Sequence, residues 1–289
     1  MSATRDGLHF YSPESESRAS RRQDLESGLR RALARGEFVV HYQPQTRLAD
    51  GATTSVEALI RWNSPELGWL PPSQFIPLAE ETGLIEPIGA WVLETAAAQA
   101  RAWRDAGLRE LRMCVNVSAR QLNQRFVETV SRVLAETGLP ASALELEITE
   151  GVRLGRDPVT QATLKSLREL GVGFAIDDFG TGYATFEYIK RLPVSTLKLD
   201  GLFVGGLCEN ADDAAIVAAS VALARGLGLR LVAEGVETAG QHQWLRALGC
   251  DECQGHYVHR PLPAAALEKI LAARSQSAPA DRLRLVVAH

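Results

Sequence analysis

The chain has 289 residues, of which 46% are hydrophobic and 23% are charged, and its formal net charge is −4. A chain of this length and balance can bury a substantial core without disulfides or structural metals. A mildly acidic protein has no general attraction for nucleic acid or membrane surfaces, so we expect neither as a partner, and an anionic ligand needs local positive charge or metal.

The two ends of the chain differ from the middle in composition. Residues 1–23 are rich in Ser, Arg and Glu and are predicted to be a flexible tail, followed by a short amphipathic helix over 24–34. Residues 274–289 open with a loop-like sequence and are assigned to a second tail. We see no apolar signal segment and no uninterrupted apolar stretch that could span a membrane, so we expect a cytoplasmic protein.

Between these tails, short apolar strands alternate with helical patterns, such as those over 89–106 and 211–227. Eight strands are predicted, at residues 38–45, 55–62, 112–118, 143–150, 172–178, 196–200, 230–234 and 254–258. Eight strands with helical crossovers favour an α/β fold of the (β/α)₈ barrel type, which takes about 250 residues. A doubly wound open sheet is the alternative.

The four cysteines are scattered and do not resemble a disulfide framework. Cys250 and Cys253 form a lone CxxC pair, which lacks the second pair that a zinc site needs, so we expect ordinary buried thiols. The short GxG segments lack the full dinucleotide-binding fingerprint.

Alternation along the strands predicts a polar lining for the barrel, because successive side chains point to opposite faces. In LELEITE, for example, Leu146 and Ile148 suit the helical layer and Glu147 points inward. The same parity predicts the inward-facing residues Gln43, Glu57, Leu59, Arg61, Asn116, Glu147, Asp177, Lys198, Asp200, Glu234 and Gln254.

Most of these polar residues lie near the C-terminal ends of their strands, where catalytic groups gather in such barrels. Several carboxylates cannot be buried together without positive charge, of which Lys198 supplies one unit. The predicted metal ligands are Glu57, Asn116, Glu147, Asp177, Asp178 and Glu234. Such oxygen ligands suit Mg²⁺ or Mn²⁺ better than Zn²⁺, and two such ions could serve phosphodiester hydrolysis.

An ordered set of motifs resembles the EAL domain family, over residues 25–273. The name-giving Glu57-Ala58-Leu59 lies in EALIRW, and the other segments are HYQPQTRL, PPSQFIPLAEETGLI, NVSARQL, LELEITE, AIDDFGTGYA, LPVSTLKLD, AEGVET and GCDECQGHYVHRPLP. A lone tripeptide would carry no information, whereas this ordered set is highly specific. We therefore divide the chain into a tail (1–23), an EAL domain (24–273) and a tail (274–289).

The resemblance implies a barrel whose first strand runs antiparallel to the others. It implies an enzyme that hydrolyses cyclic di-GMP to linear pGpG with Mg²⁺ or Mn²⁺ and that forms a homodimer. Ca²⁺ is expected to inhibit, because its larger radius and looser coordination would disturb the spacing of two metals. Glu57, Asn116, Glu147 and Asp177 match the ligands of one metal, and Asp177, Asp178 and Glu234 match the region of the second.

The resemblance also implies roles for other residues. Lys198 matches the lysine that orients the attacking water, and Glu150 matches the glutamate that holds the loop after the fifth strand. With Glu234 and Asp178 these form the predicted catalytic set. The predicted substrate-binding and supporting residues are Gln43, Leu59, Arg61, Asp200, Gln254 and Glu237.

Three departures from the family pattern leave every predicted metal ligand in place. Gln45-Thr46-Arg47 replaces the common Ile-Val-Asp, residues 184–187 read ATFE rather than SSLS, and Gly201 replaces a frequent arginine. Two alternatives stay open. One is a catalytically silent EAL module that senses cyclic di-GMP or binds a protein, and the other is a different metal-dependent phosphoesterase. The complete ligand set and the DDFGTG loop favour the active enzyme.

Overall fold

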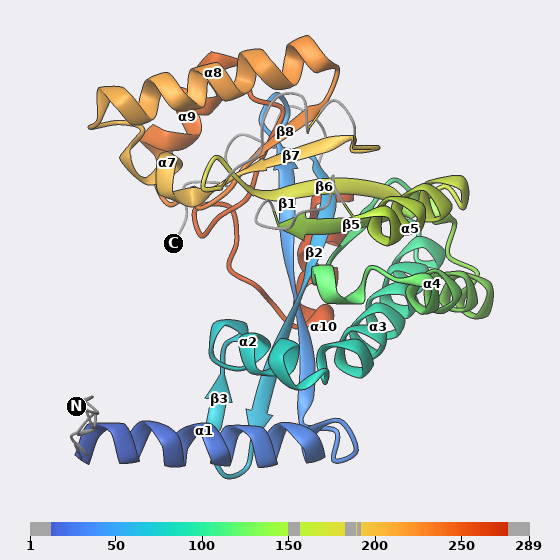
Figure 1. Cartoon of the computed structure of the whole chain (residues 1–289). Coiled ribbons are helices and arrows are strands. Elements are labelled where there is room, and N and C mark those ends of the chain that lie inside the picture. Colours follow the sequence, from blue (N-terminus) through green and yellow to red (C-terminus); the bar gives the residue numbers. More distant parts are fainter. Residues whose placement is uncertain (1–12, 150–156, 183–188, 190–191, 277–289) are drawn as a thin grey trace, which may run out of the picture. The chain divides into compact units, whose positions relative to one another are not determined.

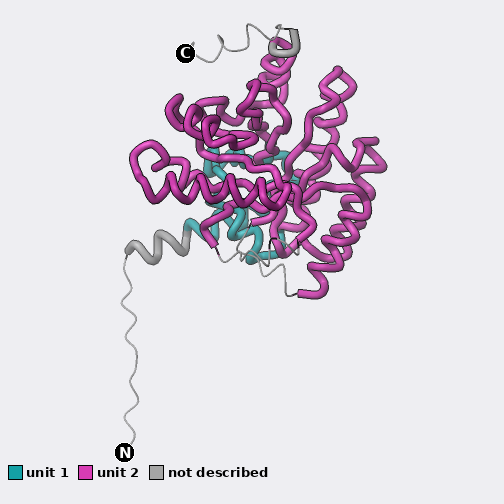
Figure 2. Tube along the Cα trace, turned by 90° about the horizontal axis from the view of Figure 1, so that it is seen from above, with its two compact units in different colours: residues 1–39, 61–84 teal, residues 40–60, 85–289 magenta. Residues whose placement is uncertain are grey.

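The computed structural model of the chain describes residues 13–149, 157–182, 189 and 192–276 (Figure 1). The chain divides into two compact units, coloured separately in Figure 2. The larger unit comprises residues 40–60 and 85–289, and the smaller comprises residues 1–39 and 61–84.

The larger unit is built on a closed barrel. Within its described residues, the sheet runs in the order β1-β9-β8-β7-β6-β5-β4-β2, and a further pairing of β1 with β2 closes it; β3, which follows β2 in the sheet order, belongs to the smaller unit. The strands are β1 (Phe38–Arg47), β2 (Thr53–Ser64), β3 (Gly68–Leu70), β4 (Arg112–Asn116), β5 (Leu144–Thr149), β6 (Gly173–Phe179), β7 (Thr196–Leu199), β8 (Arg230–Ala233) and β9 (Glu252–Cys253). Closure excludes the doubly wound open sheet.

Strand direction confirms the predicted barrel variant. The first strand, β1, pairs antiparallel with β9, with Thr46 opposite Cys253. From β2 through β4 and on to β9, each successive pair is parallel. Because parallel neighbours need a crossover, helices fill most of the connections between these strands (Figure 1).

Among its described residues, the larger unit has the helices α3 (Ile85–Asp105), α4 (Gln124–Thr137), α5 (Pro158–Glu169), α7 (Gly201–Gly206), α8 (Ala211–Leu227), α9 (Ala239–Leu248) and α10 (Ala264–Gln276). Helix α4 shows why these segments begin and end where they do. The Asn123 side chain accepts a hydrogen bond from the Phe126 amide, and Gly138 ends the helix in the left-handed conformation. Its buried face then packs Val130 and Val133 into the core.

The strand parity predicted from the sequence holds in the barrel wall. Leu146 and Ile148 are buried, as are Leu197 and Leu199 in the core beneath α7 and α8. The cysteine pair behaves as expected, since Cys250 and Cys253 are buried free thiols. Burial raises the pKa of Cys250 to about 12 and that of Cys253 to about 11.

The prediction for the last strand was wrong. The strand expected at 254–258 lies instead at Glu252–Cys253. Beyond it the backbone turns, because the amides of Val258 and His259 both bond to the carbonyl of Gly255. A Cβ on Gly255 would lie 2.1 Å from the Val236 carbonyl oxygen, so only glycine permits this close approach. An alternating pattern here reflects a tight turn rather than a strand.

The smaller unit contains α1 (Pro13–Ala32), β3 and α2 (Pro72–Thr82). Its core is aromatic: Trp62 is fully buried against Phe38 and Phe75, and its indole nitrogen donates to Glu37 Oε2 at 2.9 Å. Strand β3 was not predicted, because three residues carry too little pattern to reveal a strand.

The ends of the chain also differ from expectation. Helix α1 begins at Pro13 rather than near residue 24, and α10 continues to Gln276. Proline is accepted at a first helical position, and Glu and Arg are good helix formers, so a polar composition that suggests flexibility is equally compatible with a helix. The rest of the two predicted tails, at 1–12 and 277–289, lies outside the described residues. Among the described helices, none combines the length and the apolar character needed to cross a membrane.

We predict that Leu167→Ala lowers the free energy of unfolding by about 2–5 kcal/mol, because Leu167 is fully buried on the inner face of α5. Leu170→Ala, at the end of the same helix and 39% exposed, is the matched control and should cost less than about 1 kcal/mol. Urea denaturation measures both. Equal losses would show that α5 does not pack as described.

Candidate metal centre

Polar side chains from several strands converge where the parallel strands of the larger unit end. The strand register aligns these positions along the barrel axis, since Asn116 pairs with Glu147 and Asp177 pairs with Thr149. Parallel strands share one direction, so their C-terminal ends open at one mouth of the barrel. Five carboxylates, one amide and one lysine form what we call the acidic cluster: Glu57, Asn116, Glu147, Asp177, Asp178, Lys198 and Glu234.

Lys198 lies at the centre of the acidic cluster and is 1% exposed. Its Nζ lies 2.7 Å from Glu147 Oε2, 2.8 Å from Glu234 Oε1 and 3.0 Å from Asp177 Oδ1. Glu57 Oε2 is 3.5 Å away. Burial alone would lower the pKa of Lys198, but these carboxylates outweigh burial and raise the pKa well above its usual value. The side chain is therefore an ammonium.

Glu147 and Glu57 have pKa values shifted in opposite directions. Burial, followed by the charge of Glu57, raises the pKa of Glu147 well above its usual value. Burial also acts to raise the pKa of Glu57, but the Lys198 ammonium and the amides of Gln254 and Asn116 outweigh it and lower that pKa. The two amides donate to the two Glu57 oxygens, each at 2.6 Å. Glu57 is thus a fixed carboxylate.

A local distortion of β6 brings two adjacent aspartates to the same site. The register with β7 shifts between Ile176 and Phe179, and Asp178 has a φ of 53°, the one positive φ among the described non-glycine residues. In a regular strand, Asp177 and Asp178 would face opposite sides. Here one oxygen from each, together with one from Glu234, lies within 4.8 Å of the others.

Asp178 and Glu234 both have a pKa above the usual value of a carboxyl group. Burial and the charges of Asp177 and Asp200 raise the pKa of Asp178 to about 6. Burial raises the pKa of Glu234 to about 8, with Asp177 and Glu57 adding to the rise and Lys198 opposing it. Like charges this close favour protonation unless a cation neutralises them.

The donor set fits a hard divalent cation. Glu147 Oε1 and Asp177 Oδ1 are buried without a hydrogen-bond partner in the described part of the chain, although Asp177 Oδ1 makes the charge contact with Lys198. One ammonium balances only one of the five carboxylates in the cluster. Oxygen ligands and uncompensated negative charge together are what Mg²⁺, Mn²⁺ and Ca²⁺ require, so the residues present can hold such an ion.

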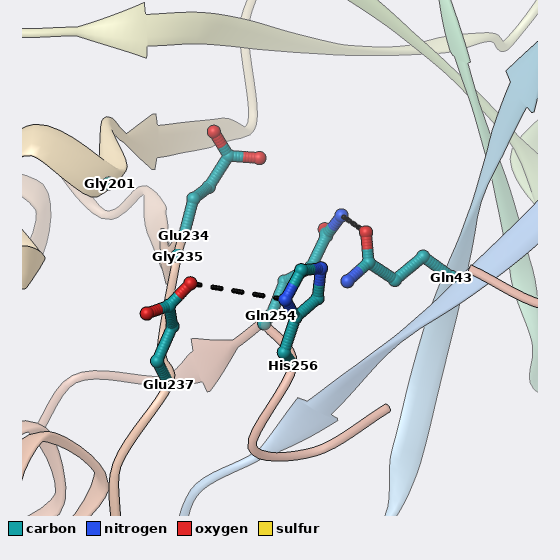
Figure 3. A pocket seen from close by; sticks show the side chains of 8 residues that line it. Gln43, Gly201, Glu234, Gly235, Glu237, Gln254 and His256 are labelled. Atoms are coloured by element: carbon teal, nitrogen blue, oxygen red, sulfur yellow. Dashed lines mark hydrogen bonds and ion pairs between the residues drawn. The ribbon is translucent and has the colours of Figure 1, made fainter. Parts of the chain in front are cut away.

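A pocket of about 320 Å³ opens beside the acidic cluster (Figure 3). Its lining residues are Gln43, Gly201, Glu234, Gly235, Glu237, Gln254, Gly255 and His256. Glu234 connects the pocket to Lys198, while Glu237 Oε1 lies 3.9 Å from His256 Nδ1 at its rim. A ligand in this pocket would therefore lie within reach of the metal-binding carboxylates.

The other predicted residues have varied positions. Asp200 caps α7 by accepting the Leu202 amide at 2.6 Å and faces Asp178, and Leu59 is partly buried in β2. Arg61 belongs to the smaller unit, so its part in the site remains an expectation. Glu150 lies outside the described residues.

Sequence reasoning assigned no role to three polar neighbours of the site. Gln45 and Ser55 form hydrogen bonds that continue inward from Gln254, and His256 lines the pocket. Parity could have found Gln45, because it shares the inward face of β1 with Gln43. His256 follows β9 in a turn, so strand alternation carries no signal for it.

A barrel with an oxygen-rich carboxylate centre at its C-terminal mouth defines a class of metal-binding (β/α)₈ proteins. The EAL domain model matches residues 26–261, and the chain belongs to the EAL domain family.

Similar proteins agree with this assignment. The bifunctional diguanylate cyclase/cyclic di-GMP phosphodiesterase MucR of Pseudomonas aeruginosa is 44% identical to this chain. The match covers 91% of this chain and 38% of MucR. The cyclic di-GMP phosphodiesterase PdeR of Escherichia coli is 38% identical over 90% of this chain and 39% of its own length. The chain thus spans about two fifths of these relatives.

Solved structures agree as well. The PaMucR phosphodiesterase in complex with c-di-GMP superposes with a TM-score of 0.81 at 47% identity, covering 84% of this chain and 99% of that one. The EAL domain of Mycobacterium smegmatis DcpA gives a TM-score of 0.69 at 38% identity, covering 82% and 97%.

We predict that Mg²⁺ affinity rises with pH between about 6 and 8. The pKa of Asp178 is about 6 and that of Glu234 about 8, so protons compete with the metal below these values and leave as pH rises. Calorimetry in buffers of different ionisation enthalpy would count the protons released. Asp178→Asn should release fewer. An affinity that is the same at pH 6 and pH 8 would contradict these protonation states.

Proposed function

We propose that this chain hydrolyses cyclic di-GMP to linear pGpG with Mg²⁺ or Mn²⁺. The observation that carries the proposal is the carboxylate cluster around Lys198, beside a pocket, in a chain similar to proteins named as cyclic di-GMP phosphodiesterases. The pocket and the carboxylates lie together at the mouth of the barrel, where substrate phosphate and metal would have to meet.

In this proposal, Glu57, Asn116, Glu147 and Asp177 hold one metal ion. Asp177, Asp178 and Glu234 hold the second. Bound divalent ions supply Lewis-acid activation of water and stabilise the charge on the scissile phosphate. Ca²⁺ would bind but inhibit, because its larger radius and looser coordination disturb the spacing of the two ions.

The remaining polar groups bind substrate and position water. Lys198 stays charged among the carboxylates, so it is a poor base and a good hydrogen-bond donor. We assign it the role of orienting the attacking water, with Asp178, Glu234 and Glu150 as its catalytic partners. The substrate-binding and supporting residues of the proposal are Gln43, Leu59, Arg61, Asp200, Gln254 and Glu237.

Two further proposals concern the state of the protein. A homodimer, with the segment after Asp178 linking its interface to the metals, follows from the family resemblance. Action in the cytoplasm is the expectation from the sequence. The alternative function is a silent EAL module that binds cyclic di-GMP without cleaving it. The presence of all the predicted metal ligands favours hydrolysis over that alternative.

We predict that the chain converts cyclic di-GMP to pGpG with Mn²⁺ or Mg²⁺ and that chelator or excess Ca²⁺ stops the reaction. Chromatography of the products measures this directly. Glu57→Ala should abolish turnover, while Glu169→Ala on the exposed side of α5 is the matched control and should leave it unchanged. Full activity in excess EDTA would contradict the proposal, and binding of cyclic di-GMP without turnover would favour the silent module.

We predict that Lys198→Ala lowers kcat by about 100-fold or more and largely preserves substrate affinity, because misorientation of water acts on the chemical step. Lys165→Ala, at a lysine that is 79% exposed, is the control. Substrate affinity is measured by calorimetry with Ca²⁺ in place of the active metal. A collapse of affinity with normal kcat at saturation would make Lys198 a phosphate-binding residue instead.

A further inference from the structure

Gln45 is a polar side chain inside the barrel that the proposed mechanism does not use. It lies in β1, is 1% exposed and points to the inner face together with Gln43. A primary amide at such a depth must find partners for its oxygen and its nitrogen, or its burial is strongly unfavourable.

Two short hydrogen bonds fix the orientation of the Gln45 amide, and the Cys114 thiol makes a longer one to its Oε1 at 3.9 Å. Its Oε1 accepts from Ser55 Oγ at 2.6 Å, and its Nε2 donates to Gln254 Oε1 at 2.8 Å. Because Gln254 Oε1 is engaged in this way, Gln254 Nε2 faces the other side. There it donates to Glu57 Oε2 at 2.6 Å and to Gln43 Oε1 at 3.0 Å.

The result is a one-way chain of donors, from Ser55 through Gln45 and Gln254 to the Glu57 carboxylate. These groups are all at most 7% exposed, so each depends mainly on its neighbours in the chain for its hydrogen bonds. Glu57 therefore accepts a hydrogen bond from a Gln254 amide whose position and orientation are fixed by Gln45. A ligand carboxylate supported in this manner binds metal more tightly than one that is free to rotate.

We propose that Gln45 is a positioning residue of the metal centre, which sets metal affinity by holding Gln254 against Glu57. The inference rests on the proposed metal-dependent function. It concerns this chain in particular, because Gln45 stands where the family pattern commonly has isoleucine, a residue that can make neither hydrogen bond.

The test is calorimetric titration of the metal-free protein with Mn²⁺. Gln45→Leu removes both hydrogen bonds, and Gln45→Met does the same with a flexible side chain of similar length. Each should weaken Mn²⁺ binding by about 10-fold, the lower end of the effect of outer-sphere partners on metal sites. Thr46→Val is the matched control, since Thr46 is 4% exposed in the same strand and contacts Cys253 Sγ instead of the chain of amides. It should leave Mn²⁺ affinity unchanged.

Melting temperatures of the metal-free variants separate positioning from simple destabilisation. Wild-type affinity in both Gln45 variants, or an equal loss in Thr46→Val, would overturn the proposal. So would variants that are unfolded at the titration temperature while Thr46→Val stays folded, because Gln45 would then support the barrel rather than the site. A wild-type chain that binds no Mn²⁺ would overturn the proposed function itself, and this inference with it.

Discussion

The buried ammonium of Lys198 is the interaction on which the site depends. Moving a charged lysine to 1% exposure is unfavourable unless several opposite charges surround it, and Glu147, Asp177 and Glu234 lie within 3.0 Å of its Nζ. The converse also holds, since these carboxylates could not be buried side by side without the ammonium. Each side of the arrangement requires the other, yet the negative charge remains in excess. That excess is what makes the mouth of the barrel a binding place for cations.

The barrel supplies the geometry that this arrangement needs. Parallel strands end together, so single residues from β2, β4, β5, β6 and β7 reach one point although they are far apart in the chain. The distorted end of β6 adds a second carboxylate where a regular strand would offer one. A left-handed φ at Asp178 is locally unfavourable, and it is tolerated because the neighbouring strands hold the backbone in place.

Support for the site extends well beneath the carboxylates. Glu57 is held by amides from Asn116 and Gln254, and the amides continue inward to Gln45 and Ser55. At the far end, Ser55 meets the ion pair of Arg112 and Glu252, which are 3.1 Å apart. A polar column thus crosses the core of the barrel, with hydrogen bonds linking one member to the next. Such a column is costly if any member is missing, and it fixes side-chain orientations when all are present.

The sequence by itself determined the order of the strands up to β8, apart from β3, together with the inward parity of the polar residues and the family. Those features are local: a period of two along a strand, or a motif such as EALIRW or DDFGTG, can be recognised without knowledge of the fold. Parity could also place Glu57, Glu147 and Lys198 on one face, but it could not give their distances. Only the tertiary structure decided that Lys198 Nζ contacts four carboxylates, that Asp178 turns back toward Asp177, and that Gln45 bonds to Gln254. Each of these contacts joins residues whose separation depends on barrel closure, twist and a bulge, and none of these quantities is recorded in the pattern of a single strand.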